Sequence, residues 1–155
     1  SAWVDDAPQI VDRAGLEAIV GERRPGFVGE LVRSGLVENR PDGTYLVTSP
    51  GLLRVSARLD DANVTLDVAA GAMTILQKHL ARSASELASH FAAHAGDGFG
   101  RGDSVQGITD AFRELRAISL ESVRLIFARE MEQVLRKMVE TGEASKLDKK
   151  RRKKR

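Results

Sequence analysis

The sequence predicts a mainly α-helical protein, with a small winged helix-turn-helix-like module followed by long helices in a hairpin or bundle. Two observations predict this fold class. Apolar residues recur at steps of three and four over long stretches, which is the spacing of one helical face. Early in the chain, an Asp-Gly turn signal between two short apolar runs interrupts that pattern and indicates a hairpin.

The amino-acid composition suits helix-on-helix packing. Hydrophobic residues make up 42% of the 155 residues but aromatic residues only 5%, which favours a helical core over an aromatic-lined pocket. The chain has no cysteine, which excludes disulfides and cysteine-ligated metal sites and indicates a cytoplasmic location. No stretch approaches the run of about 20 apolar residues that a membrane span needs, so we expect no membrane association of the folded part.

Two short helices are predicted at the start of the module. Residues 10–20 carry an imperfect helical pattern that ends at Gly21, and residues 25–34 carry a second pattern that ends at Gly35. Pro25 stands where the first turn of a helix tolerates proline.

A hairpin and a third helix complete the module. Leu36-Val37 and Tyr45-Leu46-Val47 flank the turn signal Pro41-Asp42-Gly43. Ser49 is a suitable N-cap and Pro50 a suitable first residue for the third helix. That helix carries the apolar residues Leu52, Leu53, Val55 and Leu59.

A long helix with one apolar stripe is predicted next. The stripe covers about seven turns and consists of Leu66, Ala69, Met73, Leu76, Leu80, Ala84, Leu87 and Phe91. Residues 95–104 hold four glycines and two aspartates, which predicts a loop.

Two further helices are predicted after the loop. The first runs from Val105 to Ile118, and Ser119 can cap a last long helix that ends at Gly142. The apolar stripe of this last helix consists of Leu120, Val123, Phe127, Met131, Val134 and Met138, again at steps of three and four.

Charge is distributed unevenly along the chain. Residues 146–155 hold eight basic residues and one acidic residue, a local charge of +7, so the formal net charge of +2 leaves −5 for the remainder. An acidic body argues against a broad phosphate-binding face on the folded part. The basic segment is a like-charge block that we expect to be disordered in isolation. It either binds DNA or anionic lipid or serves as a solubilising extension.

Four short sequence pieces stand in an order that resembles the MerR family of bacterial transcription regulators. They are Gly35-Leu36-Val37 after the second helix, Gly43-Thr44-Tyr45 in the wing, Ser49-Pro50 at the third helix, and the polar break Asp60-Asp61-Ala62-Asn63. The resemblance covers residues 10 to about 94. It implies a homodimeric, DNA-binding transcription regulator.

The sequence departs from that family at the helix that reads DNA. Family members usually present an Arg and a Tyr just before the Gly-Leu step, where this sequence has Gly29 and Glu30 or Leu31. A carboxylate repels phosphates and a glycine has no side chain for reading bases. We therefore interpret the module as a degenerate copy, and the resemblance implies a DNA-binding domain upstream of residue 1. The start at Ser1-Ala2, without an initiator Met, also predicts a piece of a longer protein.

Three regions are predicted on this basis. They are a winged helix-turn-helix-like module over residues 3–62, a helical dimerisation and regulatory region over 63–142, and a disordered basic tail over 143–155. The expected function is that of the C-terminal dimerisation and regulatory domain of a MerR-like regulator. Two alternatives stay open: a helical module that senses a small molecule, and a winged helix that binds DNA directly.

The apolar stripes supply the candidate binding residues. We expect the dimer interface to consist of Leu120, Phe127, Met131, Val134 and Met138, with Leu76, Leu80 and Leu87 beneath them. For the sensing alternative, a small apolar effector would bind in a pocket lined by Met73, Leu76, Phe112 and Met131.

Charged and polar motifs provide weaker candidates. Arg23, Arg24 and Arg33 are possible DNA contacts, although acidic neighbours favour ordinary solvated surface charges. His90 and His94 have a metal-ligand spacing, but two solvent-facing histidines at a helix end are the commoner finding, so we expect no metal site.

No motif in the sequence indicates catalysis. The glycine-rich segment 96–102 lacks the Gly-Lys-Ser/Thr ending of a phosphate-binding loop, so it is interpreted as a connection between helices. The chain offers no nucleophile with a nearby base and no carboxylate pair in a pocket-forming context. We expect neither enzymatic activity nor a cofactor.

Overall fold

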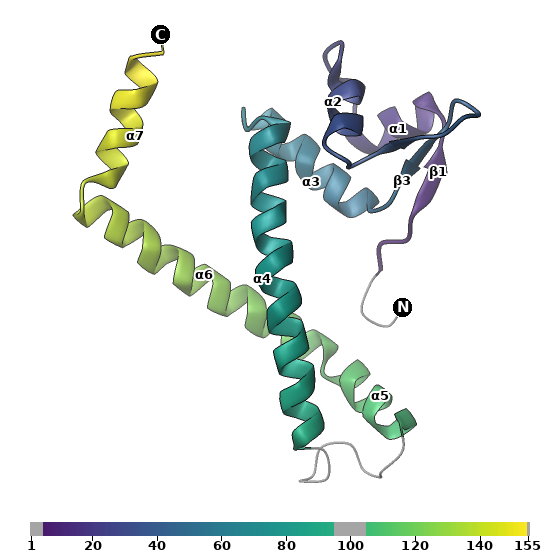
Figure 1. Cartoon of the computed structure of the whole chain (residues 1–155), viewed down its shortest axis with the longest axis vertical. Helices are drawn as coiled ribbons and strands as arrows, with labels where there is room; N and C mark the ends of the chain where they lie inside the picture. The colour runs from purple at the N-terminus through teal and green to yellow at the C-terminus, as the bar shows by residue number, and fades with distance from the viewer. Residues whose placement is uncertain (1–4, 95–104, 155) are drawn as a thin grey trace. The chain divides into compact units, whose positions relative to one another are not determined.

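The computed structural model describes residues 5–94 and 105–154. The chain divides into two compact units, Ser1–Asp97 and Gly98–Arg155. The fold is mainly α, as predicted, with a small sheet near the N-terminus and long helices after it (Figure 1). None of the helices in the described ranges is long and apolar enough to cross a membrane.

The first unit begins with the winged helix-turn-helix-like module. Its elements are β1 (Gln9–Val11), α1 (Arg13–Val20), α2 (Phe27–Arg33), β2 (Glu38–Asn39), β3 (Tyr45–Val47) and α3 (Pro50–Asp61). The three strands form an antiparallel sheet in the order β1-β3-β2. Leu46 in the central strand lies opposite Ile10 on one side and Glu38 on the other.

The start of the first predicted helix was wrong. Residues 9–11 pair with β3 as a strand, and the helix begins only at Arg13. The carboxylate of Asp12 caps α1 by accepting a hydrogen bond from the backbone N–H of Gly15 at 2.7 Å. A Cβ on Gly15 would lie 2.8 Å from the Cβ of Val11, so this tight strand-to-helix connection requires glycine.

The predicted hairpin is confirmed. The Gly43 N–H donates to the Arg40 carbonyl at 3.1 Å, and the Arg40 N–H donates to the Thr44 carbonyl at 2.9 Å. Gly43 adopts a φ of 81°, the left-handed conformation that a short hairpin turn needs. Asp42 stabilises the turn by accepting from the Thr44 backbone N–H at 3.0 Å, and this hydrogen bonding lowers the pKa of Asp42.

The module encloses a continuous apolar core. Its buried residues come from the three helices of the module, from the residue before β2, from β3 and from the start of the next helix: Leu16, Val20, Phe27, Leu31, Val37, Val47, Leu53, Ala57 and Leu66. Leu66 belongs to the first turn of α4 (Leu66–Ala93), so the long helix closes the core and then extends away from it (Figure 1). Ser56, the buried polar residue of this core, donates to the Leu52 carbonyl at 2.9 Å.

An N-terminal aspartate fastens the chain to α3. Ser49 caps α3, as predicted, by accepting from the Leu52 N–H at 3.1 Å. Asp6 adds a second cap, since its carboxylate accepts from the Ser49 hydroxyl and from the Gly51 N–H. These hydrogen bonds lower the pKa of Asp6.

The second unit consists of helices. They are α5 (Val105–Glu114), α6 (Arg116–Glu140) and α7 (Glu143–Arg152). The break between α5 and α6 falls at Leu115, before the predicted cap Ser119. The predicted loop at 95–104 lies outside the described residues.

Residues 143–152 of the segment 143–155, for which disorder is expected from the sequence, form the helix α7. Lys and Arg have good intrinsic helix propensity, and this local preference accounts for the helix in spite of like-charge repulsion.

Candidate protein-interaction surfaces

One face of α4 is buried at its start and exposed further along. Steps of three and four place the stripe from Leu66 to Phe91 on one side of the helix. Leu66, inside the module, is 2% exposed, whereas Leu80 and Leu87 further along the same face are 46% and 48% exposed. This stripe therefore serves as core in its first turn and as apolar surface afterwards.

A second apolar stripe covers one face of α6. In the described part of the second unit, no residue of α6 is buried. Phe127 is 51% exposed, Met131 41% and Val134 50%, and these residues share a face with Leu120 and Met138. The structure thus gives all five predicted interface residues to one helix and places them on one side of it. That they bind a second copy stays a prediction.

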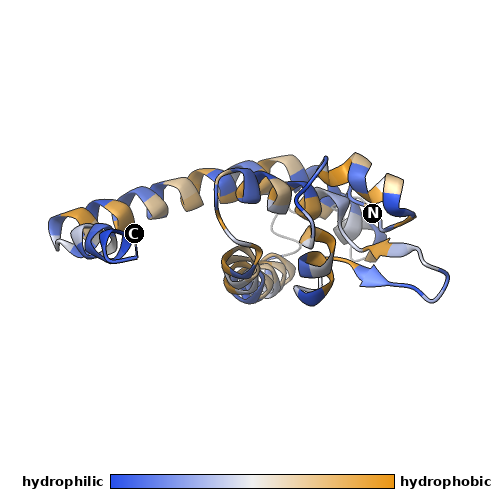
Figure 2. Cartoon of the chain, turned by 90° about the horizontal axis from the view of Figure 1, so that it is seen from above, coloured by the Kyte–Doolittle hydropathy of each residue, from blue (hydrophilic) through white to orange (hydrophobic). Residues whose placement is uncertain are grey.

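The surface of α6 also carries two ion pairs between residues close in sequence. Glu121 and Arg124 form an ion pair at 2.7 Å, and Arg136 and Glu132 form another at 3.2 Å. The hydrogen bond from Arg124 lowers the pKa of Glu121. These pairs link residues three or four apart on the helix surface and need no partner from elsewhere. Figure 2 shows the resulting alternation of hydrophobic and hydrophilic residues along the helices.

The predicted effector-pocket residues are divided between the two units. Met73 is half-buried and Leu76 exposed on α4, while Phe112 is half-buried on α5 and Met131 is exposed on α6. The pocket stays a prediction.

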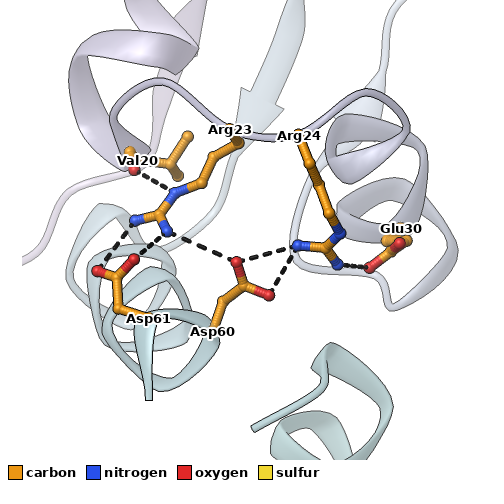
Figure 3. A network of polar contacts seen from close by, with 6 residues as sticks. All are labelled: Val20, Arg23, Arg24, Glu30, Asp60 and Asp61. Atoms are coloured by element: carbon orange, nitrogen blue, oxygen red, sulfur yellow. Dashed lines mark hydrogen bonds and ion pairs between the residues drawn. The ribbon is translucent and has the colours of Figure 1, made fainter. Parts of the chain in front are cut away.

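Arg23 is a predicted DNA contact, but its side chain joins an internal network. Its Nε donates to the Val20 carbonyl at 2.8 Å, and its guanidinium forms ion pairs with Asp61 and, at 3.5 Å, with Asp60 (Figure 3). The hydrogen bond with Asp61 raises the pKa of Arg23 and lowers the pKa of that carboxylate. The side chain is only 17% exposed.

Arg24 extends the network to α2. Its Nη1 lies 2.8 Å from a carboxylate oxygen of Asp60, and its Nη2 lies 2.7 Å from Glu30 (Figure 3). The guanidinium carbons of Arg23 and Arg24 also lie 5.5 Å and 5.2 Å from the ring centroid of Phe27. The pair therefore ties the turn between α1 and α2 to the end of α3.

Arg33 is exposed at the end of α2 but stands in a mixed-charge environment. A shallow pocket of about 280 Å³ is lined by Arg24, Glu30, Arg33, Thr65, Leu66 and Asp67. The charges of the two cations and the two carboxylates in this lining largely cancel. Over residues 5–65, ten carboxylates face seven arginines. The module therefore lacks the excess of positive charge that phosphate binding requires.

The histidine pair lies at the C-terminal end of α4. The rings of His90 and His94 lie 4.5 Å apart, and Nδ1 of His94 is 2.8 Å from the His90 carbonyl. Among the described residues, no group of three or more His, Cys, Asp or Glu side chains could hold a metal ion.

The sequence alone did not predict the arginine network or the Asp6 cap. The available signal was the pair of opposite-charge dipeptides, Arg23-Arg24 and Asp60-Asp61. They stand almost 40 residues apart, so only the fold could reveal that they meet.

Comparison of the chain with family models, with curated proteins and with solved structures gives no match.

Proposed function

We propose that this chain is the dimerisation and regulatory part of a MerR-like transcription regulator. The observation that carries the proposal is the exposed apolar stripe of α6, a face of Leu, Phe, Met and Val side chains at steps of three and four. This spacing is that of helices that pair through a common seam. Two copies of such a face are self-complementary about a two-fold axis.

The free energies of burial and of association fit a dimer that uses the apolar stripes of both α6 and α4. Completing the burial of the five α6 side chains in each copy, of which four are about half exposed and Met138 is partly buried, contributes on the order of 10 kcal/mol. Association costs roughly 4–15 kcal/mol in lost translational and rotational freedom. Burial of the α6 stripe alone therefore roughly offsets the free-energy cost of association. The exposed leucines of α4, namely Leu76, Leu80 and Leu87, supply the further burial that makes the dimer stable.

The regulatory role rests on the resemblance to the MerR family and on the charge of the module. Arg23 and Arg24 are engaged with carboxylates, Gly29 is exposed on α2, and Glu30 beside it is partly buried and paired with Arg24. These features support the proposal that the module does not itself read DNA, and the resemblance to the MerR family implies that another domain does so. The rival proposal, direct DNA binding by the module, requires phosphate contacts from a surface with net negative charge.

The test is the solution mass of the chain by light scattering across a dilution series. The wild type is expected to be a dimer. The double variant Phe127→Ala with Met131→Ala is expected to have a dimer dissociation constant at least tenfold higher. Leu125→Ala with Val139→Ala is the matched control, because these residues are similarly exposed but lie on another face of α6. Equal masses for the two double variants, or a monomeric wild type at all concentrations, would contradict the proposal.

A further inference from the structure

The end of the chain carries a dense cluster of cations on a helix. Residues 146–155, named here the basic arm, hold eight Lys and Arg residues and one Asp. The last turn of α7 contains Lys149, Lys150, Arg151 and Arg152 in succession. Successive residues of an α-helix point about 100° apart. These four side chains therefore surround the helix.

The cations of the basic arm are unpaired in the described part of the chain. Between Lys146 and Lys154, every described basic side chain is exposed, and none forms an ion pair within 4.0 Å. By contrast, Arg23 and Arg24 in the module each have carboxylate partners. The basic arm thus keeps its full charge available for an external polyanion.

A phosphodiester backbone fits this charge better than a lipid surface does. A helix that lies on a membrane needs a broad apolar face, and the sequence of α7 contains only Ala144 and Leu147 as apolar residues. Duplex DNA carries one negative charge per roughly 1.7 Å of axis, and the four successive cations at the end of α7 span about 6 Å of helix. Over that length, their charge matches the charge density of the duplex.

We infer that the basic arm binds the phosphodiester backbone of duplex DNA without sequence preference. It would add nonspecific affinity to a regulator whose sequence reading takes place elsewhere. The choice of DNA as the polyanion rests on the proposed function, whereas the electrostatics of the arm do not. In a dimer, two arms bind the same duplex, so the second contact becomes intramolecular and strengthens the first.

The test is fluorescence anisotropy of a labelled 30-base-pair duplex of arbitrary sequence, titrated with the full chain at several salt concentrations. Eight neutralised phosphates predict a slope of log affinity against log salt of about −7 for each arm. The variant K149Q/K150Q/R151Q/R152Q is expected to reduce that slope by about half and to weaken binding at least tenfold. The matched control is R33Q/R40Q/R54Q/R58Q, four exposed arginines of the module, which is expected to leave the slope unchanged.

Three results would overturn the inference. They are no DNA binding at low salt, DNA binding that survives the four substitutions in the arm, and loss of binding in the module variant. Vesicles containing anionic phosphatidylserine are titrated in parallel, and binding to vesicles with none to DNA would identify a membrane surface instead. Light scattering of the same variants separates this inference from the proposed function, because changes in the arm leave the α6 stripe intact.

Discussion

The module and helix α6 contain similar apolar residues, but these residues are buried in the module and exposed on α6. Leu31 and Phe27 of α2 are buried beneath other elements of the module, while Phe127 and Met131 of α6 stay about half exposed. The difference lies in the partners and not in the side chains. The short elements of the module fold back on one another, whereas α6 offers a long apolar face that its own unit leaves open.

Helix α4 shows both behaviours within one element. Its first turn contributes Leu66 to the core, and the same face continues past the module as exposed surface. A face that serves only as core would end where the core ends. Its continuation is what we expect of a helix that packs against a partner, and in the proposed dimer a second copy would supply a matching face.

The largest expected effect breaks the module. Leu53→Ala removes an α3 side chain from the buried core of the module and is expected to lower the free energy of unfolding by about 2–5 kcal/mol. Leu52→Ala, at the neighbouring half-exposed position, is expected to cost under about 1 kcal/mol. Hydrogen exchange of the module amides in urea measures both. Similar losses for the two variants would show that the core is placed wrongly.

The next effect tests the exposed stripe and spares the module. Leu80→Glu puts a charge into the proposed seam and is expected to raise the dimer dissociation constant about a hundredfold, because a carboxylate in an apolar interface loses its hydration. Sedimentation equilibrium gives the constant, and hydrogen exchange of the module is expected to be unchanged. Ile75→Glu is the control, since Ile75 is similarly exposed on another side of α4. A dimer weakened equally by both substitutions would argue against a specific seam.

Two glycines distinguish a close contact in the module from an open helix surface. Gly15→Ala forces a Cβ against Val11 and is expected to destabilise the module by about 1–3 kcal/mol. Gly71→Ala in α4 has nothing within 4 Å of the new Cβ and is expected to stabilise the helix by about 0.5–1 kcal/mol. Thermal unfolding followed by circular dichroism compares the variants. Opposite signs are expected, and destabilisation by both would refute the open environment of Gly71.

The smallest expected effect is a pH dependence of the stability of the module. The folded module lowers the pKa of Asp6 and Asp61 below the ordinary value of 3.8, so their stabilising contribution is complete above that value. It is lost as the pH falls through the lowered pKa values. Melting temperatures between pH 7 and pH 2 should therefore stay level and then fall at the acid end. Asp6→Asn with Asp61→Asn should show a shallower fall, and an unchanged profile would count against both contacts.

Much of the fold could be predicted because its signals are local. The third helix was located by Ser49 and Pro50, and the hairpin by Asp42-Gly43. The strand at residues 9–11 was missed because Ile10 and Val11 also fit the helical pattern that follows. Only pairing with β3 decides between the two interpretations. The candidate interface could be predicted because apolar residues at steps of three and four can be recognised in the sequence without knowing what they bind.

By itself, the sequence determined which residues form the long apolar stripes and where the cations gather, since both depend on spacing along the chain. Only the tertiary structure decided that Leu66 is core while Leu80 is surface, and that Arg23 and Arg24 bind carboxylates within the module. Arg23 and Asp61 stand 38 positions apart, and their meeting depends on how α1, α2 and α3 pack. Burial and ion pairing are properties of neighbours in space, and one-dimensional spacing does not specify which neighbours those are.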